Sequence, residues 1–360
     1  MFLKIKGIMS LVLFFAVLGF SGCEKINHAD LFEGEIKNQP IIVMTYNVYL
    51  GSSTEPVLNV SNLLQVPTEV ANVYNNFIQS NFPARATEIA KSIKEHQPHL
   101  IGLQEMSLIR SQSPGDRILG GLVPASEVVM DFRSVLLDAL SAEGLNYRIA
   151  GEVENVDVEM PMLTDEGIVD IRLTDYDVIL AREDVGISEL SSTNFTNTYS
   201  VDMLGLEIKR GYVGVNATIN GNTYRFINTH LEAFSQDIRV SQTRELIDGL
   251  SQESLPIILL GDFNTEAPSG ESYSLLIEAG YMDAWVTDMH GSGETCCQDA
   301  DLLNEANKHF KRIDHIFVGS MVSNLLLSTT KKVGDSSETR KKLGMWPSDH
   351  SGVVSKLFIK

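Results

Sequence analysis

The chain has 360 residues, 43% of them hydrophobic, which is enough for a large packed core and excludes a disordered or fibrous protein. Its three cysteines exclude a disulfide scaffold and a zinc site built from two CxxC pairs. Lys and Arg number 28 against 47 Asp and Glu, a formal net charge of −19. This charge argues against a broad basic groove that holds polyanions, but not against an enzyme that brings a metal cation to an anionic substrate.

The N-terminal residues have the pattern of an export signal. Lys4 and Lys6 precede an apolar run at 8–20 that is too short to span a bilayer comfortably. The run is followed by the sequence FSGC, which resembles a bacterial lipobox, where cleavage leaves Cys23 at the new N-terminus for lipid attachment. An ordinary signal peptide and an uncleaved anchor helix are the alternatives.

We therefore expect three parts in chain order. Residues 1–22 would be a lipoprotein signal peptide, 23–40 the lipidated cysteine and a polar tether, and 41–360 one large α/β domain with insertions. Removal of the signal leaves 26 basic against 47 acidic residues, a net charge of −21. Cys23 would anchor the protein in the membrane of the cell envelope, either in the periplasm or exposed at the surface.

Apolar periodicity predicts a mixture of strands and helices from residue 41 onwards. Strands are expected at 41–46, 99–104, 178–181, 212–219, 223–229, 256–260, 313–318 and 352–359. Helices are expected at 83–95, 132–145 and 236–249. The dipeptide Asn220-Gly221 predicts a hairpin, which disfavours a purely parallel sheet. Two packed sheets with helices outside fit better, with insertions at 52–82 and 107–170.

Polar side chains interrupt or border several of the predicted strands, at the ends where α/β sites are built. They are Asn47, Glu105, His230, Asp262, Asn264, Asp314, Asp349 and His350. Each residue alone is more often a turn former, a helix cap or a structural histidine. Together they combine oxygen ligands suited to Mg²⁺ or Mn²⁺ with two histidines. That combination is typical of phosphoester hydrolysis, in which a metal offsets phosphate charge and a carboxylate activates water.

The motifs around these residues carry a family resemblance. The blocks TYN, LQE, NTHLE, GDFNT, RIDHIFV and SDH occur in that order between residues 45 and 350. They resemble the endonuclease/exonuclease/phosphatase superfamily, which includes deoxyribonuclease I, inositol-polyphosphate phosphatases and bacterial sphingomyelinases. The resemblance spans about residues 40–358 and implies a four-layered α/β/β/α sandwich with two central mixed or antiparallel sheets, in which 41–360 is the catalytic domain.

The resemblance also implies roles for individual residues. Asn47 and Glu105 would hold the metal, with Asp349 as a further ligand or near-ligand. Asp262 would orient or activate the attacking water, and Asn264 would help to fix the phosphate.

Two histidines would contact the phosphate in the same scheme. His230 and His350 would bond the non-bridging phosphate oxygens, and Asp314 would orient His350. Asp175 lies where relatives often carry an acidic residue, so it is the expected partner of His230. Tyr176 replaces a glycine of the family pattern and would either donate its hydroxyl to phosphate or pack in the core.

Four further features are candidates for substrate specificity. Arg210 opens a strand and would be a structural salt-bridging residue or a phosphate contact. Cys296 and Cys297 would form a vicinal disulfide, remain free or simply pack, in a loop near the site. Residues 331–342 hold five basic against two acidic residues and would be a solvated loop or a basic rim that recruits an anionic substrate. The apolar residues of 52–82 would pack in the core or cover an apolar part of a substrate.

The sequence therefore predicts a lipid-anchored, Mg²⁺- or Mn²⁺-dependent phosphodiesterase or phosphatase of the cell envelope, acting as a monomer. Its anionic substrate would be a nucleic acid, a phospholipid headgroup or a small phosphoester. The alternative is a catalytically silent surface-binding lipoprotein with the same fold. That alternative predicts loss of His230, Asp262 or His350, and none of them is lost.

Overall fold

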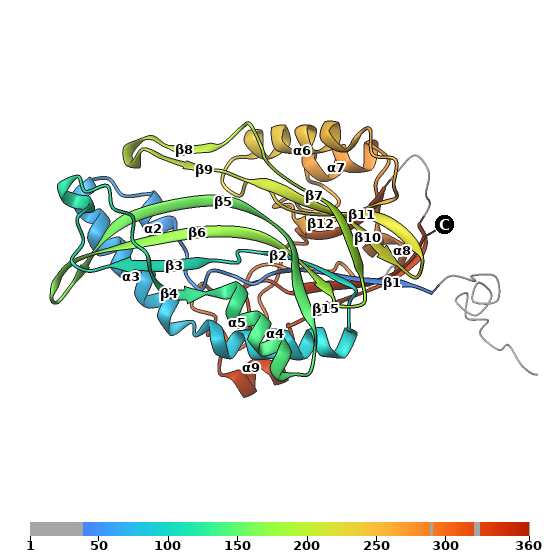
Figure 1. Cartoon of the computed structure of the whole chain (residues 1–360), viewed down its shortest axis with the longest axis horizontal. Helices are drawn as coiled ribbons and strands as arrows, with labels where there is room; N and C mark the ends of the chain where they lie inside the picture. The colour runs from blue at the N-terminus through green and yellow to red at the C-terminus, as the bar shows by residue number, and fades with distance from the viewer. Residues whose placement is uncertain (1–38, 289–290, 320–324, 360) are drawn as a thin grey trace, which may run out of the picture. The chain divides into compact units, whose positions relative to one another are not determined.

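The computed structural model describes residues 39–288, 291–319 and 325–359 of the chain. The predicted signal peptide and the lipidation site at Cys23 lie outside the described residues. Within these residues, the strands form two large sheets, and helices cover the outer faces of both sheets (Figure 1). No helix in the described ranges is long and apolar enough to cross a membrane.

The first sheet has the strand order β15-β16-β1-β2-β6-β3-β4, and β5 also pairs with β6. Its strands are β1 (Ile41–Asn47), β2 (Leu100–Gln104), β3 (Leu108–Gln112), β4 (Glu127–Asp131), β5 (Tyr147–Thr164), β6 (Gly167–Arg182), β15 (Leu325–Val333) and β16 (Gly352–Ile359). Strands β1 and β2 run parallel, and the other adjacent pairs run antiparallel. The helices on this side of the sandwich are α2 (Glu55–Leu58), α3 (Val66–Gln79), α4 (Phe82–His96), α5 (Phe132–Ala142) and α9 (Ser337–Leu343) (Figure 1).

The second sheet has the strand order β13-β14-β12-β11-β10-β7. Its strands are β7 (Gly186–Asn194), β10 (Gly211–Ile219), β11 (Asn222–His230), β12 (Ile257–Asp262), β13 (Met282–Asp283) and β14 (Asp314–Gly319). Strands β11 and β12 run parallel, and the remaining pairs run antiparallel. Helices α6 (Gln236–Leu250) and α7 (Glu271–Glu278) cover its outer face (Figure 1). A short β8 (Tyr199–Val201) and β9 (Leu206–Ile208) pair separately, and α8 (Ala284–Asp288) follows β13.

Buried apolar side chains form three layers that hold the sandwich together. One cluster, which includes Ile89 and Leu136, lies between the first sheet and its helices. A second cluster, which includes Val43 and Phe226, fills the space between the two sheets. A third, which includes Leu246, lies between the second sheet and its helices. The predicted α/β/β/α sandwich with two central mixed sheets is confirmed.

Local signals explain several boundaries that the sequence predicts well. Helix α4 begins after Asn81, whose side chain accepts a hydrogen bond from Ala84 N. The predicted hairpin joins β10 to β11, and Asn220 and Gly221 both have positive φ, at 52° and 82°. This is the conformation that an Asn-Gly pair adopts in a tight two-residue turn. The helix predicted at 132–145 ends earlier, at Ala142.

The segments expected as insertions are more regular than predicted. Residues 107–170 are not turn-rich, because β5 extends over 18 residues and β6 over 16, forming one long antiparallel hairpin. The strand predicted at 178–181 is only the last part of β6. The segment 52–82 is largely helical and forms α2 and α3. The basic segment 331–342 is the end of β15 followed by α9, so it is not a loop.

A buried polar network joins the two sheets beside the ends of the central strands. Gln104 Nε2 donates a hydrogen bond of 2.7 Å to Asn228 Oδ1. Asn228 Nδ2 donates in turn to the carbonyls of Leu103 at 3.0 Å and Val178 at 3.1 Å. A Cβ on Gly102 would lie 2.6 Å from Asn228 Oδ1, so glycine permits this close approach between the sheets. Because buried amides must keep their partners, the network fixes how the sheets pack next to the site.

Candidate functional site

The strand ends bring the motif residues together at one end of the sandwich. Strand β1 ends at Asn47, which pairs in register with Gln104 of parallel β2, directly before Glu105. Strand β11 ends at His230, which pairs in register with Asp262 at the end of parallel β12. Asp262 also lies opposite Asp314, the first residue of antiparallel β14. Residues more than 200 positions apart in the sequence therefore share one polar cluster.

Asp262 is the centre of this cluster. Asn47 Nδ2 donates to Asp262 Oδ2 at 3.1 Å and to Glu105 Oε1 at 3.0 Å. The Nε2 atoms of His230 and His350 lie 3.5 Å and 3.8 Å from the same Asp262 oxygen. Burial, and then the nearby Asp314 carboxylate, raise the pKa of Asp262 to about 7. A buried carboxylate between two imidazoles is suited to orienting a water molecule and accepting its proton.

The backbone after Asp262 turns sharply and is fixed by that same carboxylate. Asn264 has φ 49° and its N–H donates to Asp262 Oδ1 at 2.9 Å. Its side chain amide donates to the Leu231 carbonyl at 2.9 Å. The amide of Asn264 is thus held close to Asp262, and its predicted contact with phosphate stays a prediction.

His350 and Asp314 form a close pair. His350 Nδ1 lies 2.9 Å from Asp314 Oδ2. Burial alone would lower the pKa of His350, but the carboxylates of Asp314, Asp349 and Asp262 raise it well above the ordinary value. Asp314 holds Nδ1 as a donor and leaves Nε2 directed to the Asp262 side of the cluster.

His230 has the opposite electrostatic environment. Its Nδ1 lies 3.1 Å from Arg210 Nη1, so Nδ1 accepts and Nε2 carries the proton. Burial, then Arg210 and then His350 lower the pKa of His230 well below the ordinary value. The two imidazoles on either side of Asp262 therefore have pKa values shifted in opposite directions.

The prediction that Asp175 is the acidic partner of His230 is wrong. Asp175 Oδ2 lies 3.8 Å from Arg210 Nη1 and 3.3 Å from Asn155 Nδ2, and no described contact joins it to His230. The closer carboxylate is Asp177, whose Oδ1 lies 4.0 Å from His230 Nδ1. Sequence reasoning missed Asp177, although it follows Asp175 by two positions and so lies on the same face of β6. Arg210 Nη1 lies within 4 Å of both Asp175 and His230.

Tyr176 is likewise not at the phosphate site. It lies between the two aspartates on β6, so its side chain points to the opposite face of the strand. Its ring packs 4.3 Å from the Arg133 guanidinium of α5, and it does not line the cavity described below. Its side chain is half-buried and packs against the apolar cluster between the first sheet and its helices.

A cavity of about 540 Å³ opens onto the cluster. Its polar end, which we call the floor, is lined by Glu105, Asp175, Arg210, His230, Asp262, Asn264, Asp349 and His350. Asn47 and Asp314 lie directly behind the floor, hydrogen-bonded to its residues. The rest of the cavity, which we call the arm, is lined mainly by apolar side chains of α2, α3, β3, β5, β6 and β9.

The floor has the donor set of a divalent cation site. Glu105, whose Oε2 accepts from Leu50 N at 2.7 Å, and Asp349 offer carboxylate oxygens at the floor. Burial raises the pKa of Asp349 to about 7; His350 acts against this shift and Glu105 adds to it. Asp314 Oδ1 is buried and has no hydrogen-bond partner. Carboxylates in excess of nearby cations fit a hard divalent ion.

A buried arginine holds the loops that carry the floor. The Arg85 guanidinium donates to the carbonyls of Val48 at 2.6 Å, Tyr49 at 2.9 Å and Pro347 at 2.9 Å, and its Nε donates to Ser80 O at 3.0 Å. These bonds fix the chain that follows Asn47 to the chain that precedes Asp349. Although burial lowers the pKa of Arg85 to about 10, the group remains charged at neutral pH.

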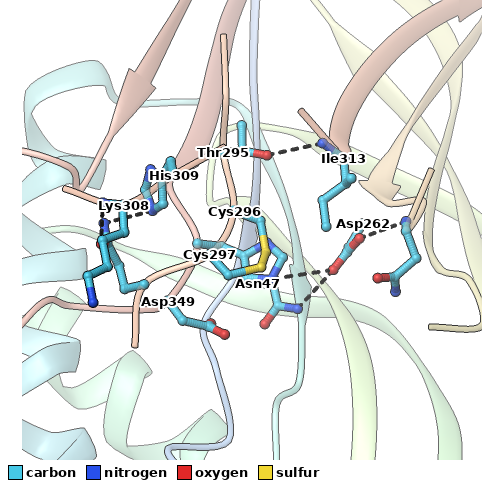
Figure 2. The surroundings of a disulfide bond; sticks show 12 residues. Asn47, Asp262, Thr295, Cys296, Cys297, Lys308, His309, Ile313 and Asp349 are labelled. Carbon is cyan, nitrogen blue, oxygen red and sulfur yellow. Dashed lines mark hydrogen bonds and ion pairs between the residues drawn. A yellow bond between two sulfur atoms is a disulfide. The ribbon is translucent and has the colours of Figure 1, made fainter. Parts of the chain in front are cut away.

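A vicinal disulfide between Cys296 and Cys297 lies beside the floor and lines the cavity (Figure 2). Thr295 Oγ1 accepts hydrogen bonds of 3.3 Å from the N–H groups of Ile313 and Asp314. Cys296 forms isolated β-bridges with Lys311 and His350. The disulfide loop therefore braces the backbone that presents Asp314 and His350.

The basic segment 331–342 is not a rim of the cavity. Lys332 Nζ donates to the Glu294 carbonyl at 2.8 Å and pairs with Asp335 at 3.1 Å, and Lys342 lies 3.8 Å from Glu88 of α4. None of its residues lines the described part of the cavity. The cation that does is Lys311, an exposed residue that sequence reasoning missed.

Comparisons with known proteins identify a family and solved structures with a similar fold. The model of the endonuclease/exonuclease/phosphatase family matches residues 44–350. A crystal structure of a family member from Bacteroides thetaiotaomicron is 18% identical with a TM-score of 0.53 and covers 89% of this chain and 98% of that chain. A mannosyl-6-phosphatase from the same species is 18% identical with a TM-score of 0.51, at 88% and 99% coverage. Truncated Caenorhabditis elegans TDP2 is 17% identical with a TM-score of 0.50, at 89% and 97% coverage.

At these identities the solved structures establish the fold alone, and no functionally curated protein matches the chain. The family model covers most of the chain and every block of motif residues from Asn47 to His350. Family members are phosphoesterases or nucleases, generally dependent on divalent metals. The chain belongs to the endonuclease/exonuclease/phosphatase family.

Proposed function

We propose that the protein is a Mg²⁺- or Mn²⁺-dependent phosphoester hydrolase with Asp262 as the residue that activates water. The observation that carries the proposal is the position of the Asp262 carboxylate, buried at the floor of the cavity and within 3.8 Å of two histidine Nε2 atoms. Asn47 and the Asn264 backbone N–H hold its two oxygens in place. Its raised pKa makes it a competent proton acceptor near neutral pH.

The two histidines would act on the phosphate in different protonation states. His350, kept protonated by Asp314, would stabilise negative charge on a non-bridging oxygen as the water attacks. His230 would donate a neutral Nε2–H to a second oxygen, since Arg210 occupies its Nδ1. Arg210 lines the same wall and adds positive charge near the substrate.

Glu105, Asp349 and the Asn47 carboxamide oxygen are the residues that would hold the cation. When bound, the ion would offset the phosphate charge and polarise the ester. Asn47 has a second role, because its amide donates to both Glu105 and Asp262 and so sets the distance between the ligand group and the water-activating group. The excess of carboxylates at the floor supports this assignment.

We further propose that the enzyme acts as a lipid-anchored monomer of the cell envelope. The support is the signal pattern that ends at Cys23. The silent surface-binding lipoprotein is disfavoured, because His230, Asp262 and His350 are all retained and converge on one cavity.

Hydrolysis of bis-p-nitrophenyl phosphate tests the proposal. We expect activity with Mg²⁺ or Mn²⁺ that EDTA abolishes, and a loss of at least 100-fold in His350→Ala. His96→Ala on α4 is the matched control and should keep full activity, because His96 bonds only the Ser92 carbonyl of its own helix among the described contacts. Absence of hydrolysis of both this diester and p-nitrophenyl phosphate with either ion would contradict the proposal and favour the binding lipoprotein.

A further inference from the structure

The arm of the cavity is lined mainly by apolar side chains, although the adjoining floor is polar. Its wall on the first sheet comes from the long β5–β6 hairpin. Val156 pairs with Asp175, Val158 with Leu173 and Met160 with Ile171. Since alternate residues of a strand share a face, these pairs form a continuous apolar strip. The strip begins at a carboxylate of the floor and runs outward along the hairpin.

The opposite wall comes from segments that lie far away in the sequence. Val73 and Tyr74 of α3 line the arm from the segment 52–82, and Leu206 and Ile208 of β9 line it from the second half of the chain. In Figure 1, α3, the β5–β6 hairpin and the β8–β9 pair extend to the same end of the molecule. The arm is thus a groove between separate elements, continuous with the site.

Part of the apolar lining of the arm remains accessible to solvent. Val73, Val156, Val158, Met160 and Leu173 are only half-buried, although they are apolar and lie between covering elements. Leaving such surface in contact with water costs about 25 cal/mol per Å² relative to burying it. A groove of this size and composition is typical of a ligand site that the ligand completes.

We propose that the arm binds an aliphatic chain of an amphipathic phosphoester whose phosphate lies on the floor. The inference rests on the proposed function and names its substrate class. In the reaction, water oxygen would form a bond to phosphorus, the ester P–O bond would break, and a proton would pass to the departing oxygen. The aliphatic chain would lie in the arm whether it belongs to the departing alcohol or stays esterified to the phosphate.

The lining favours an aliphatic chain over a nucleoside or a sugar. Bases are recognised by aromatic stacking and by hydrogen bonds to their edges, and sugars need polar groups. The strip on β5 and β6 offers valine, leucine, isoleucine and methionine, and the aromatic side chains that line the cavity, Tyr49, Tyr74, Phe77 and Phe234, come from other elements. A polyanionic strand would also need several cations, whereas Arg210 and Lys311 are the ones that line the described cavity.

Chain-length dependence tests the inference with soluble probes. We would measure kcat/KM for methyl, butyl and octyl p-nitrophenyl phosphate with Mg²⁺ or Mn²⁺. Each methylene that enters the arm should raise kcat/KM by up to about four-fold, so the octyl ester should exceed the methyl ester by at least about ten-fold. Equal values for the three esters would overturn the inference and leave the proposed function intact.

Variants from both walls assign the effect to the arm. Val158→Asp on β5 and, independently, Val73→Asp on α3 should each bring the octyl-to-methyl ratio close to one. The matched control is Val128→Asp on β4, which is 60% exposed and should keep the wild-type ratio. A wild-type ratio in both arm variants, with the fold retained by circular dichroism, would contradict the proposal.

Binding gives a readout that does not depend on turnover. By calorimetry, octylphosphonate should bind at least ten-fold more tightly than methylphosphonate, with a more negative heat-capacity change. If no ester is hydrolysed but this difference is found, the hydrolase proposal fails and the arm stands. If neither the rates nor the affinities depend on chain length, the arm is not a chain site. Faster cleavage of a dodecyl ester in phosphatidylcholine vesicles than as a monomer would identify a bilayer lipid as the source.

Discussion

The floor and the arm are two ends of one cavity, yet they are built in opposite ways. The floor is carried by the ends of central strands and by tight loops, and its side chains are held by hydrogen bonds, as in the Asn47–Asp262 and Asp314–His350 pairs. The arm is carried by a hairpin and a helix at the periphery, and its residues make apolar contacts that leave them half-buried. The difference suggests that the sandwich fixes the chemistry while peripheral elements set what the phosphate is attached to.

The largest effect should separate the two ends. In Asp262→Asn we expect hydrolysis of every ester to fall by about 10²–10⁴-fold, because the proton acceptor is lost. The octyl-to-methyl ratio should stay unchanged in the residual activity, since the arm is untouched. Relief of the buried charge should raise the free energy of unfolding, whereas loss of one of the two accepted N–H bonds should lower it, so circular dichroism must show that the fold is retained. Asp248→Asn, at an exposed position of α6, serves as control. Full activity in Asp262→Asn would refute its role.

A second large effect concerns the support of the floor. Arg85→Met should lower the free energy of unfolding by about 3–5 kcal/mol, since four buried carbonyls lose their donor. The matched control is Arg148→Met, because exposed Arg148 also bonds three carbonyls but should cost less than about 1 kcal/mol. Urea unfolding followed by circular dichroism measures both. Similar losses of unfolding free energy in the two variants would show that the buried hydrogen bonds of Arg85 stabilise the fold no more than the exposed ones of Arg148 do.

The contrast between floor and arm also explains what the sequence could predict. Central strands such as β12 are buried at every position, so an uninterrupted apolar run marks them. Strand β5 has charged residues such as Glu152 and Glu154 on one face, and a β-bulge between Glu154 and Val156 shifts the alternation. A periodic pattern cannot be followed across such a shift. The sequence pattern therefore predicts an irregular insertion where the structure has this hairpin.

The same reasoning applies to the site residues. Asp262 and His350 could be found because each lies in a short motif of fixed spacing, GDFN and SDH. The direction of Tyr176, away from Asp175 and Asp177, follows from strand alternation once the strand is known. The arm could not be found, because it depends on the register that places Val158 opposite Leu173 and on α3 lying across from them. No local pattern encodes either contact.

A third prediction concerns the buried His315. It tests whether this histidine controls how much the free energy of unfolding falls as the pH is lowered. His315 Nε2 donates to the Thr265 carbonyl at 3.0 Å and Nδ1 accepts from Arg312 at 3.2 Å, so His315 is neutral when buried. Burial, then Arg312, lower its pKa to about 4. The unfolded chain therefore binds more protons between about pH 4 and pH 6.5. The stabilisation is complete above pH 6.5 and is lost as the pH falls, by at most about 3 kcal/mol.

His315→Phe should flatten that slope, whatever its effect on stability at pH 7. Unfolding by urea at a series of pH values from 4.5 to about 7 measures the change. His96→Phe on α4, partly exposed and remote from the floor, should keep the wild-type slope. An unchanged slope in His315→Phe would show that another group controls the acid sensitivity.

The smallest expected effect is the stabilisation of the folded protein by a ligand. A divalent ion tests the floor, and octylphosphonate tests the arm. A divalent ion that binds the folded protein should raise the free energy of unfolding by about 2.7 kcal/mol at 100 times its Kd, because it neutralises carboxylates such as Glu105 and Asp349. Glu105→Gln should weaken this stabilisation strongly, whereas Val158→Asp should retain it. Octylphosphonate should further stabilise the ion-loaded wild-type protein but should have little effect on ion-loaded Val158→Asp. Thermal unfolding with and without Mg²⁺ or Mn²⁺, and with and without octylphosphonate, measures both effects. If Val158→Asp loses the metal effect as fully as Glu105→Gln does, floor and arm are one coupled unit, and the division of chemistry from substrate choice fails.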